Sequence, residues 1–369
     1  MKLLTYINTH QNWRHELQEP PYSLNIITQD DYFLFHYSKA SDFSYDVVQE
    51  ANGIIIRYDA IKKEYFCLNY PYAKIFEYGS KFAPKDFDIE SAIVRQELDG
   101  MLVFCWYDGG YWHFSSTTEI DLLATEVMTD ILQACNGDMK QAEQALHPSY
   151  CYTFMLTSPS LNRIIDYGAP KLWYLGRTNI LTGKEDLQPI ISDCFAIPHL
   201  FQYLNNIKIL TSLKETMSKN EAGFILIDKN YNKIKFESNE YLLAKYFSNI
   251  GKPSIKMFIK IWQDDKLDAY INLFKTDETA VKVRNAINSF VNALEKNYQQ
   301  YSNKYRNRDI FLKHLPKFSP CESRYYTMRY DGTVIPNAEL FVKDACTADE
   351  LQGEVSRYMF KNTLAKVTQ

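Results

Sequence analysis

The order of hydrophobic and polar positions predicts strands over much of the first two thirds of this chain. Eight short runs rich in β-branched and aromatic residues are typical of β-strands. They lie at residues 53–58, 65–69, 101–106, 111–114, 152–157, 171–175, 222–227 and 233–236. The third and fourth runs flank Asp108-Gly109-Gly110, a turn that predicts a hairpin, and a second hairpin turn lies at 228–232.

Helical spacing of apolar residues predicts helices between and after these strands. They cover residues 120–135, 138–146, 257–261, 266–274 and 279–305. Strands interleaved with a few helices, without regular βαβ alternation, predict an α+β fold rich in antiparallel sheet. Because Gly251-Lys252-Pro253 interrupts regular structure, we expect one domain over 1–248 and a mostly helical domain over 249–369.

Charge and cysteine content exclude several classes of protein. The net charge of -4 argues against a strongly basic protein that coats nucleic acid. Residues 251–369 nevertheless hold 19 Lys and Arg against 14 Asp and Glu, a local excess of positive charge. The seven cysteines form no C-x-x-C pair and the seven histidines no zinc motif, so we expect no metal site. The odd cysteine count and the lack of a signal peptide or long apolar run favour a cytoplasmic protein without a membrane segment.

Six short motifs follow one another along residues 50–246. They are the stretch around Lys74, Glu97-Leu98-Asp99-Gly100, Phe154-Met155-Leu156 with Asn162-Arg163-Ile164, a strand followed by Arg177, Ala222-Gly223-Phe224-Ile225, and Lys233-Ile234-Lys235. This succession resembles the nucleotidyltransferase motifs of RNA ligases like the phage T4 RNA ligase 1 group. The resemblance implies a ligase-type nucleotidyltransferase domain, with ATP or another nucleotide and Mg²⁺ as cofactors and RNA as a partner.

Four polar positions depart from the pattern of that family. The nucleophilic lysine, which carries AMP in the family, is Glu97 here, although Asp99 and Gly100 are kept. The other departures are Met155 and Ala222 in place of glutamates, with Glu221 one residue away, and Asn52 in place of an arginine. A carboxylate has no amine to hold a nucleotide as a phosphoramidate. The resemblance therefore implies binding without a lysine–AMP intermediate.

Several cations of the family pattern are retained. They are Lys74, Arg163, Arg177, Lys233 and Lys235, which match residues on the phosphate side of the nucleotide. Residues i and i+2 of a strand share a face, so Lys233 and Lys235 are expected to converge on one anion. The alternative is a solvated outer face. Glu97 and Asp99 also offer two carboxylates that could bind a divalent ion or share a proton.

A second basic cluster lies in the helical region. It consists of Lys304, Arg306, Arg308, Lys313, His314 and Lys317, interleaved with Tyr301, Tyr305 and Phe311. Cations that follow a phosphate backbone, beside rings on which bases stack, predict an RNA-binding surface. The alternative is the polar face of a surface helix.

These residues support three hypotheses about function. The first is an RNA-ligase-like pseudoenzyme of RNA repair that binds RNA ends or a nucleotide, with room for a protein partner. The second is an active ATP-dependent RNA ligase that uses another lysine, such as Lys74 or Lys81, or acts on pre-activated ends. The third is a protein-interaction or inhibitory scaffold with a vestigial pocket. The retained cations favour the first two, and the lost carboxylates favour the first.

Overall fold

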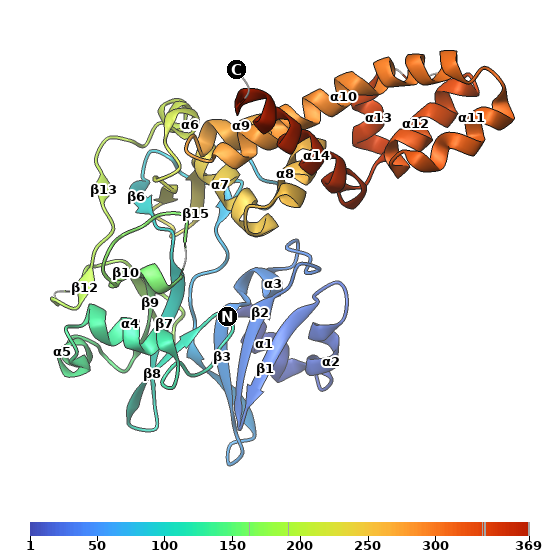
Figure 1. Ribbon diagram of the computed structural model, residues 1–369. Helices are drawn as coiled ribbons and strands as arrows, with labels where there is room; N and C mark the ends of the chain where they lie inside the picture. The colour runs from blue at the N-terminus through green and yellow to red at the C-terminus, as the bar shows by residue number, and fades with distance from the viewer. Residues whose placement is uncertain (162, 191, 334, 336, 368–369) are drawn as a thin grey trace. The chain divides into compact units, whose positions relative to one another are not determined.

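The chain folds into two compact units, Met1–Leu242 and Leu243–Gln369. The computed structural model describes residues 1–161, 163–190, 192–333, 335 and 337–367, and for residues 361–367 it describes the backbone alone. All the described strands lie in the first unit, and the described part of the second unit is helical (Figure 1). None of the helices in the described ranges combines the length and apolar character needed to cross a bilayer.

A four-stranded antiparallel sheet opens the first unit. Its strands, in spatial order, are β1 (Leu24–Gln29), β2 (Tyr32–Tyr37), β3 (Asn52–Asp59) and β4 (Glu64–Asn69). Successive residues of β3 point to opposite faces, so Ile54 and Ile56 pack with the helices while Ile55 packs with Trp106 of the second sheet. The helices are α1 (Lys2–Thr9), α2 (Trp13–Gln18) and α3 (Asp46–Glu50).

The second sheet has the order β11-β10-β9-β7-β8, with β12 beside β10. Its strands are β7 (Met101–Asp108), β8 (Tyr111–Ser116), β9 (Tyr150–Thr157), β10 (Lys171–Asn179), β11 (Glu185–Asp186) and β12 (Phe195–Ala196). Buried residues of α4 (Glu126–Ala134) and α5 (Met139–Gln144) share one hydrophobic cluster with this sheet. A 3-10 turn, Pro159–Leu161, follows β9.

The third sheet has the order β13-β6-β14-β15-β5. Its strands are β5 (Phe76–Glu77), β6 (Ile93–Glu97), β13 (Leu200–Phe201), β14 (Gly223–Ile227) and β15 (Lys233–Glu237). Helix α6 (Ile207–Thr216) covers one face, where Leu210 packs with Val94 and Phe236. Because strand residues alternate, the other face carries the residues between these apolar positions.

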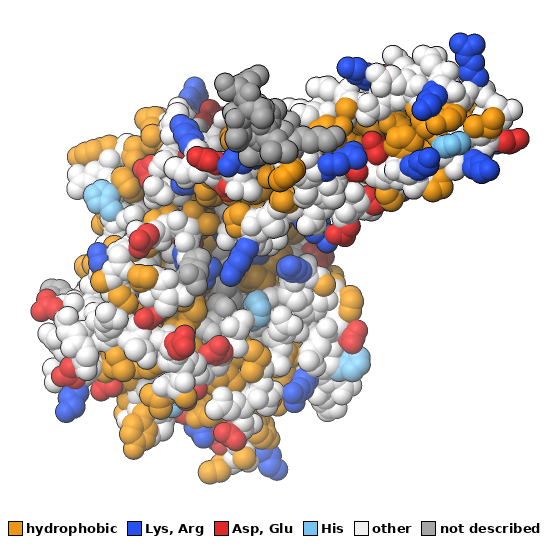
Figure 2. Space-filling view, in the orientation of Figure 1, with side chains coloured by type: hydrophobic (Ala, Val, Ile, Leu, Met, Phe, Trp, Pro, Cys, Tyr) orange, Lys and Arg blue, Asp and Glu red, His pale blue; other side chains and the backbone are white. Residues whose placement is uncertain are grey.

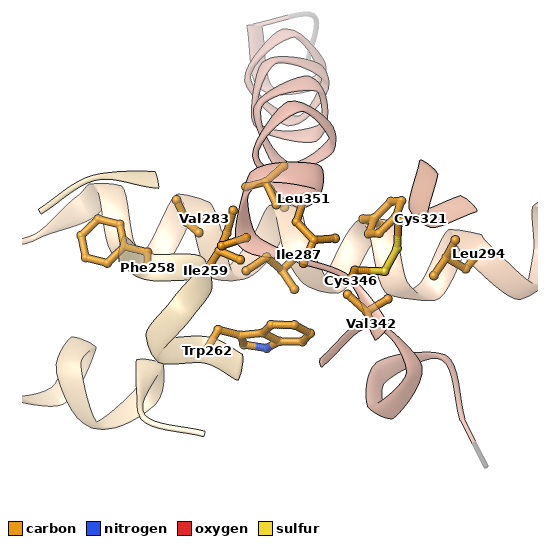
Figure 3. Close-up of a cluster of buried hydrophobic side chains, with 14 of the residues drawn as sticks. Phe258, Ile259, Trp262, Val283, Ile287, Leu294, Cys321, Val342, Cys346 and Leu351 are labelled. Carbon is orange, nitrogen blue, oxygen red and sulfur yellow. A yellow bond between two sulfur atoms is a disulfide. The ribbon is translucent and has the colours of Figure 1, made fainter. Parts of the chain in front are cut away.

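The second unit is built from helices around one hydrophobic core. They are α8 (Ile255–Gln263), α9 (Leu267–Leu273), α10 (Glu278–Lys304), α11 (Arg308–His314), α12 (Pro320–Tyr330), α13 (Ala338–Ala345) and α14 (Ala348–Val367), with a 3-10 turn at Leu315–Lys317; α7 (Asn239–Ile250) crosses the boundary of the two units. Figure 3 shows Ile259, Ile287 and Leu351 of this core, from α8, α10 and α14. Each is at most 1% exposed, so their burial contributes strongly to stability.

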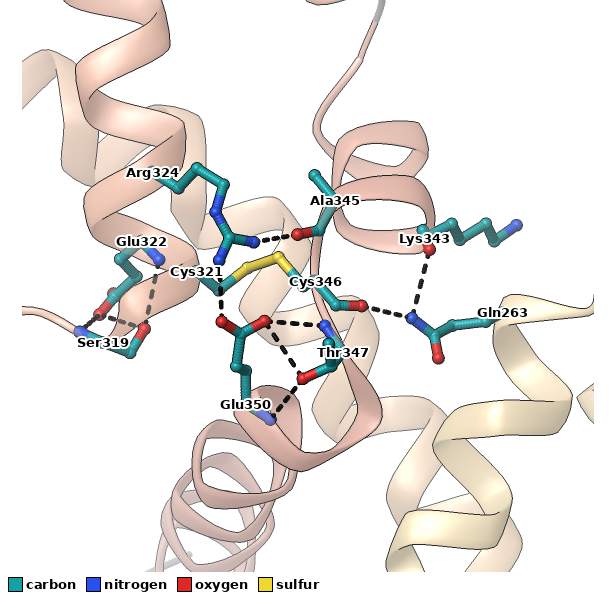
Figure 4. Close-up of a disulfide and its surroundings, with 10 residues drawn as sticks. All are labelled: Gln263, Ser319, Cys321, Glu322, Arg324, Lys343, Ala345, Cys346, Thr347 and Glu350. Carbon is teal, nitrogen blue, oxygen red and sulfur yellow. Dashed lines mark hydrogen bonds and ion pairs between the residues drawn. A yellow bond between two sulfur atoms is a disulfide. The ribbon is translucent and has the colours of Figure 1, made fainter.

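A disulfide joins Cys321 at the start of α12 to Cys346 between α13 and α14 (Figure 4). Polar contacts surround it: Arg324 pairs with Glu350, and Glu350 accepts a hydrogen bond from the backbone N–H of Thr347. No spacing pattern pointed to this pair, because the two cysteines lie 25 residues apart.

The predicted α+β architecture, rich in antiparallel sheet and followed by a helical C-terminal region, is confirmed. One helix boundary is wrong, because α4 begins at Glu126 rather than at residue 120. The N–H of Leu122 instead donates to the carbonyl of Phe114, and the Asp121 carboxylate accepts from the N–H of Leu123. These local bonds compete with the first turn of a helix. The hydrophobic pattern predicted neither the elements before β3 nor β5, β11–β13, α6, α7 and α11–α14.

Candidate functional site

A cavity of about 230 Å³ lies in the first unit, with walls contributed by all three sheets. Its charged and polar lining residues are Tyr37, Asn52, Tyr72, Lys74, Arg95, Gln96, Glu97, Lys233 and Lys235; its apolar ones include Leu98, Leu102, Met155, Leu175, Ile225 and Ile227. The fold thus gathers motif positions that are up to 183 residues apart in the sequence. Four cations face one carboxylate in this lining, which suits an anionic ligand.

Glu97, the predicted counterpart of the RNA ligases' lysine, is the last residue of β6 and lies opposite Gly223 of β14. Its Oε1 lies 3.8 Å from Nζ of Lys235, which also contacts Oε2 of Glu237 at 2.5 Å. Burial opposes the charge of Lys235, but Glu97 and then Glu237 outweigh it, so the pKa of Lys235 is raised. The carboxylate of Glu97 therefore favours the protonated form of Lys235 and partly compensates its positive charge.

Lys233 and Lys235 enter the cavity from β15, and the strand geometry explains why. Ile234 and Phe236 alternate with them and are buried with α6 on the other face. Lys233 forms an ion pair with Glu185. Burial lowers the pKa of Lys233 despite this carboxylate. The two lysines therefore share the cavity face but have different carboxylate partners.

Lys74 lies among aromatic rings rather than carboxylates. Its Nζ is 4.2 Å from the ring centre of Tyr37 and 3.9 Å from that of Phe43, distances at which a ring face stabilises a cation. Within the described ranges, no carboxylate lies at ion-pair distance from Lys74. Burial and then the charge of Lys235 lower its pKa. A larger share of neutral amine follows than for an exposed lysine.

Arg95 is a cavity residue that no sequence motif predicted. It lies two residues before Glu97 on β6, so the two side chains share a face of the strand. Nη1 of Arg95 donates to the carbonyl of Leu175 at 2.7 Å. The alternation along β6 could have indicated this placement. Val94 is buried in the core, so Arg95, the next residue, points to the opposite face of the strand.

The carboxylate of Asp99 accepts hydrogen bonds from other parts of the protein. It is 7% exposed, and its Oδ2 accepts hydrogen bonds from the backbone N–H groups of Ile164 (2.7 Å) and Ile165 (3.1 Å). The hydroxyl of Tyr241 donates to its Oδ1 at 2.8 Å. Asp99 thus fastens the segment after β9, and it does not line the cavity with Glu97 as a paired carboxylate.

Steric crowding explains why the residue after Asp99 is Gly100. A Cβ at this position would lie 2.3 Å from the carbonyl oxygen of Leu156 in β9, far inside van der Waals contact. Only glycine allows the two chain segments to come this close. Gly100 is therefore explained by the approach of the backbone to β9, without a ligand.

The two arginines predicted to bind phosphate lie outside the cavity lining. Arg177 pairs with Asp186 at 2.6 Å and lies over the ring of Tyr150. Arg163 is exposed, and Asn162 of the same motif lies outside the described residues.

The described cavity lining offers few oxygen ligands for a magnesium ion. Met155 lines the cavity without an oxygen ligand, and Ala222 is a buried alanine. Glu221 instead accepts hydrogen bonds from the N–H and hydroxyl of Ser218, away from the cavity. No group of three or more His, Cys, Asp or Glu in the described part of the chain is arranged to hold a metal. Mg²⁺ prefers oxygen ligands in octahedral geometry, and in this lining Glu97 is the carboxylate that could supply one.

The basic cluster of the second unit is exposed, but two of its rings are not. Lys304, Arg306, Arg308, Lys313 and Lys317 are all solvent-exposed, and Figure 2 shows Lys and Arg side chains over α10, α11 and α12. Tyr301 and Phe311 are buried in the helical core, so they are unavailable for stacking on bases. Tyr305 stacks on His314 with ring centres 4.5 Å apart, and Arg308 pairs with Asp331.

No protein-family model and no curated protein sequence matches the chain. Among solved structures, it is similar to a putative ATP-dependent DNA ligase from Aquifex aeolicus, with 10% identity, a TM-score of 0.38, and coverage of 87% of this chain and 98% of that one. Two forms of an archaeal ATP-dependent RNA ligase, at 11% and 9% identity and a TM-score of 0.40, are covered over 96% and 95% of their length and 87% of this chain. At these values the likeness decides nothing about activity.

Proposed function

We propose that this chain is an RNA-ligase-like protein that binds a nucleotide or an RNA end in the cavity without forming a lysine–AMP intermediate. One observation carries the proposal: Lys74, Lys233 and Lys235 line the same cavity as Glu97, the residue that the motif resemblance places at the position of the nucleophilic lysine. Cations attract the phosphates of such a ligand. Glu97 has no amine, and its carboxylate contacts Lys235 instead.

A ligase that uses a different lysine is the second candidate, and Lys74 is the residue that favours it. Lys74 lines the cavity and its pKa is lowered by burial, which favours the neutral, nucleophilic amine. Lys81, the other lysine considered, is exposed and does not line the cavity. The absence of carboxylates at Met155 and Ala222 counts against this candidate, because metal-assisted transfer needs oxygen ligands.

The decisive experiment is incubation with ATP labelled at the α-phosphate, with magnesium, followed by denaturing electrophoresis. We expect no covalent label. A label on the wild-type chain would overturn the proposal, and its loss in Lys74→Ala would establish the second candidate. Glu97→Lys should not gain a label, since the two glutamates of the family pattern would still be missing. A label on that variant would show that only the nucleophile had been lost.

Binding is tested separately, by titration with AMP and with a 5′-phosphorylated oligoribonucleotide. Lys233→Ala and Lys235→Ala should each weaken binding by about tenfold, the effect of losing a charge-assisted contact. Lys62→Ala, a change at an exposed lysine outside the cavity, is the matched control and should leave binding unchanged. Unchanged affinity in both cavity variants would place the ligand elsewhere.

We also propose that exposed cations of the second unit form an RNA-binding surface. Lys304, Arg306, Lys313 and Lys317 are exposed cations, and exposed cations contact phosphates in a salt-dependent way. Replacing all four with alanine should weaken binding of a long oligoribonucleotide but leave AMP binding unchanged. Equal binding of the long oligoribonucleotide would remove the second unit from the proposed interface.

A further inference from the structure

Arg95 differs from two other arginines of the first unit in its partners. Arg57 pairs with Asp31 and Asp108, and Arg177 pairs with Asp186. Among the described residues, the guanidinium of Arg95 makes a single hydrogen bond, from Nη1 to the carbonyl of Leu175. Its Nε is buried and has no hydrogen-bond partner. A charged group in the cavity wall is thus left with unused donors.

This arrangement is costly without a ligand. Burying a charge that has no counter-charge is unfavourable, and burial lowers the pKa of Arg95. Lys233 lies in the same wall. Burial is the main cause of its lowered pKa, and the positive charge of Arg95 adds to it. An anion between the two would relieve the repulsion and satisfy the unused donors.

The chemistry of the guanidinium narrows the choice of anion. Its Nε–H and a neighbouring Nη–H point in parallel and match two oxygens of a phosphate. The same cavity has an apolar wall that includes Leu102 and Ile225, against which the uncharged part of a nucleotide can pack. A phosphate ester with an organic moiety therefore fits better than a bare ion.

We infer that Arg95 binds the phosphate group of the cavity's ligand, with Lys233 beside it. This inference rests on the proposed function and names the residue that recognises the ligand's charge. The phosphate belongs either to a free nucleotide or to the 5′ end of an RNA, and both present the same ester to the guanidinium.

Paired ligands test this inference and distinguish the two sources. The wild-type chain is titrated with AMP against adenosine, and with an oligoribonucleotide bearing a 5′-phosphate against one bearing a 5′-hydroxyl. The phosphate should improve affinity at least about tenfold in one pair or both, as expected for a charge-assisted bidentate contact. Arg95→Met should remove that difference, and Arg95→Lys should retain part of it, because a lysine keeps the charge but lacks the paired donors.

Thermal unfolding without ligand separates a binding role from a structural one. Arg95→Met should unfold at the same temperature as the wild type or higher, because it removes a charge without a carboxylate partner. Arg57→Met is the matched control: it should unfold at a lower temperature, since two carboxylates lose their partner, and should keep the phosphate effect. An Arg95→Met chain that is destabilised yet retains the phosphate effect would overturn the inference.

Failure of the inference and failure of the proposed function give different results. If the wild type binds one of these ligands and both Arg95 variants bind it equally well, Arg95 is not the phosphate contact, although the proposed function stands. If the wild type binds none of them, the proposed function fails and the inference with it. Should Arg95→Met fail to fold, the affinity of Arg95→Lys still decides between these results.

Discussion

Replacing Asp99 distinguishes a residue that supports the site from one that binds the ligand. Asp99 belongs to the Glu97-Leu98-Asp99-Gly100 motif, yet its carboxylate accepts hydrogen bonds from Ile164, Ile165 and Tyr241 within the protein. Asp99→Asn keeps the shape of the side chain and removes its charge. We expect the variant to lose stability and to keep its affinity for AMP.

The size of the effect follows from these three contacts. Hydrogen bonds to a charged group contribute about 1.5–3 kcal/mol each. In Asp99→Asn the amide oxygen can still accept from the two backbone N–H groups, and the hydroxyl of Tyr241 can turn to accept from the amide. We therefore expect a loss of about 1–3 kcal/mol. Asp99→Ala removes all three contacts at once and should cost about 3–5 kcal/mol.

Hydrogen exchange and binding are the assays. In Asp99→Asn the amides of Ile164 and Ile165 should exchange faster, while the AMP dissociation constant, measured well below the unfolding temperature, stays within about twofold of the wild-type value. Tyr241→Phe is the matched control, which removes one hydrogen bond and should cost about 1 kcal/mol. Loss of AMP binding in a folded Asp99→Asn chain with unchanged exchange would refute this reasoning and assign Asp99 to the ligand.

Three further predictions concern charge, metal and the helical unit. Glu97→Gln should tighten AMP binding several-fold, because it removes the only carboxylate in the described cavity lining; weaker binding would contradict this. AMP binding should be the same in magnesium and in EDTA, and a magnesium requirement would show that oxygen ligands are supplied after all. Glu295 has a pKa lowered mainly by its hydrogen bond from Arg329, so it stabilises the fold above the ordinary glutamate pKa and loses that effect as pH falls below it. Glu295→Gln should therefore flatten the dependence of unfolding temperature on pH between about 5 and 3.

The strands and the two β15 lysines follow from local rules, which is why the sequence could predict them. Alternation with Ile234 and Phe236 determines that Lys233 and Lys235 share a face. The partners of these lysines could not be predicted in the same way. Glu185 lies 48 residues from Lys233 and contacts it only through the packing of the second and third sheets.

Where sequence reasoning failed, a long-range contact had decided the outcome. Asp99 looked like a residue for a ligand or metal, but hydrogen bonds to the segment at Ile164 and Ile165 use its oxygens. Tyr301 and Phe311 looked like stacking rings, but the helical core buries them. The alternation along β6 could have placed Arg95 opposite Val94, but only the tertiary structure shows that its Nε is buried without a hydrogen-bond partner.

The sequence by itself determined the α+β class and most of the strands of the first unit. These features depend on residue identity and on the period of two along a strand. The tertiary structure decided which charges face one another: Glu97 lies near Lys235, whereas no carboxylate of the described residues lies at ion-pair distance from Arg95. The reason is physical, since the cost of a charge depends on its burial and its neighbours, and both are set by segments far apart in the chain.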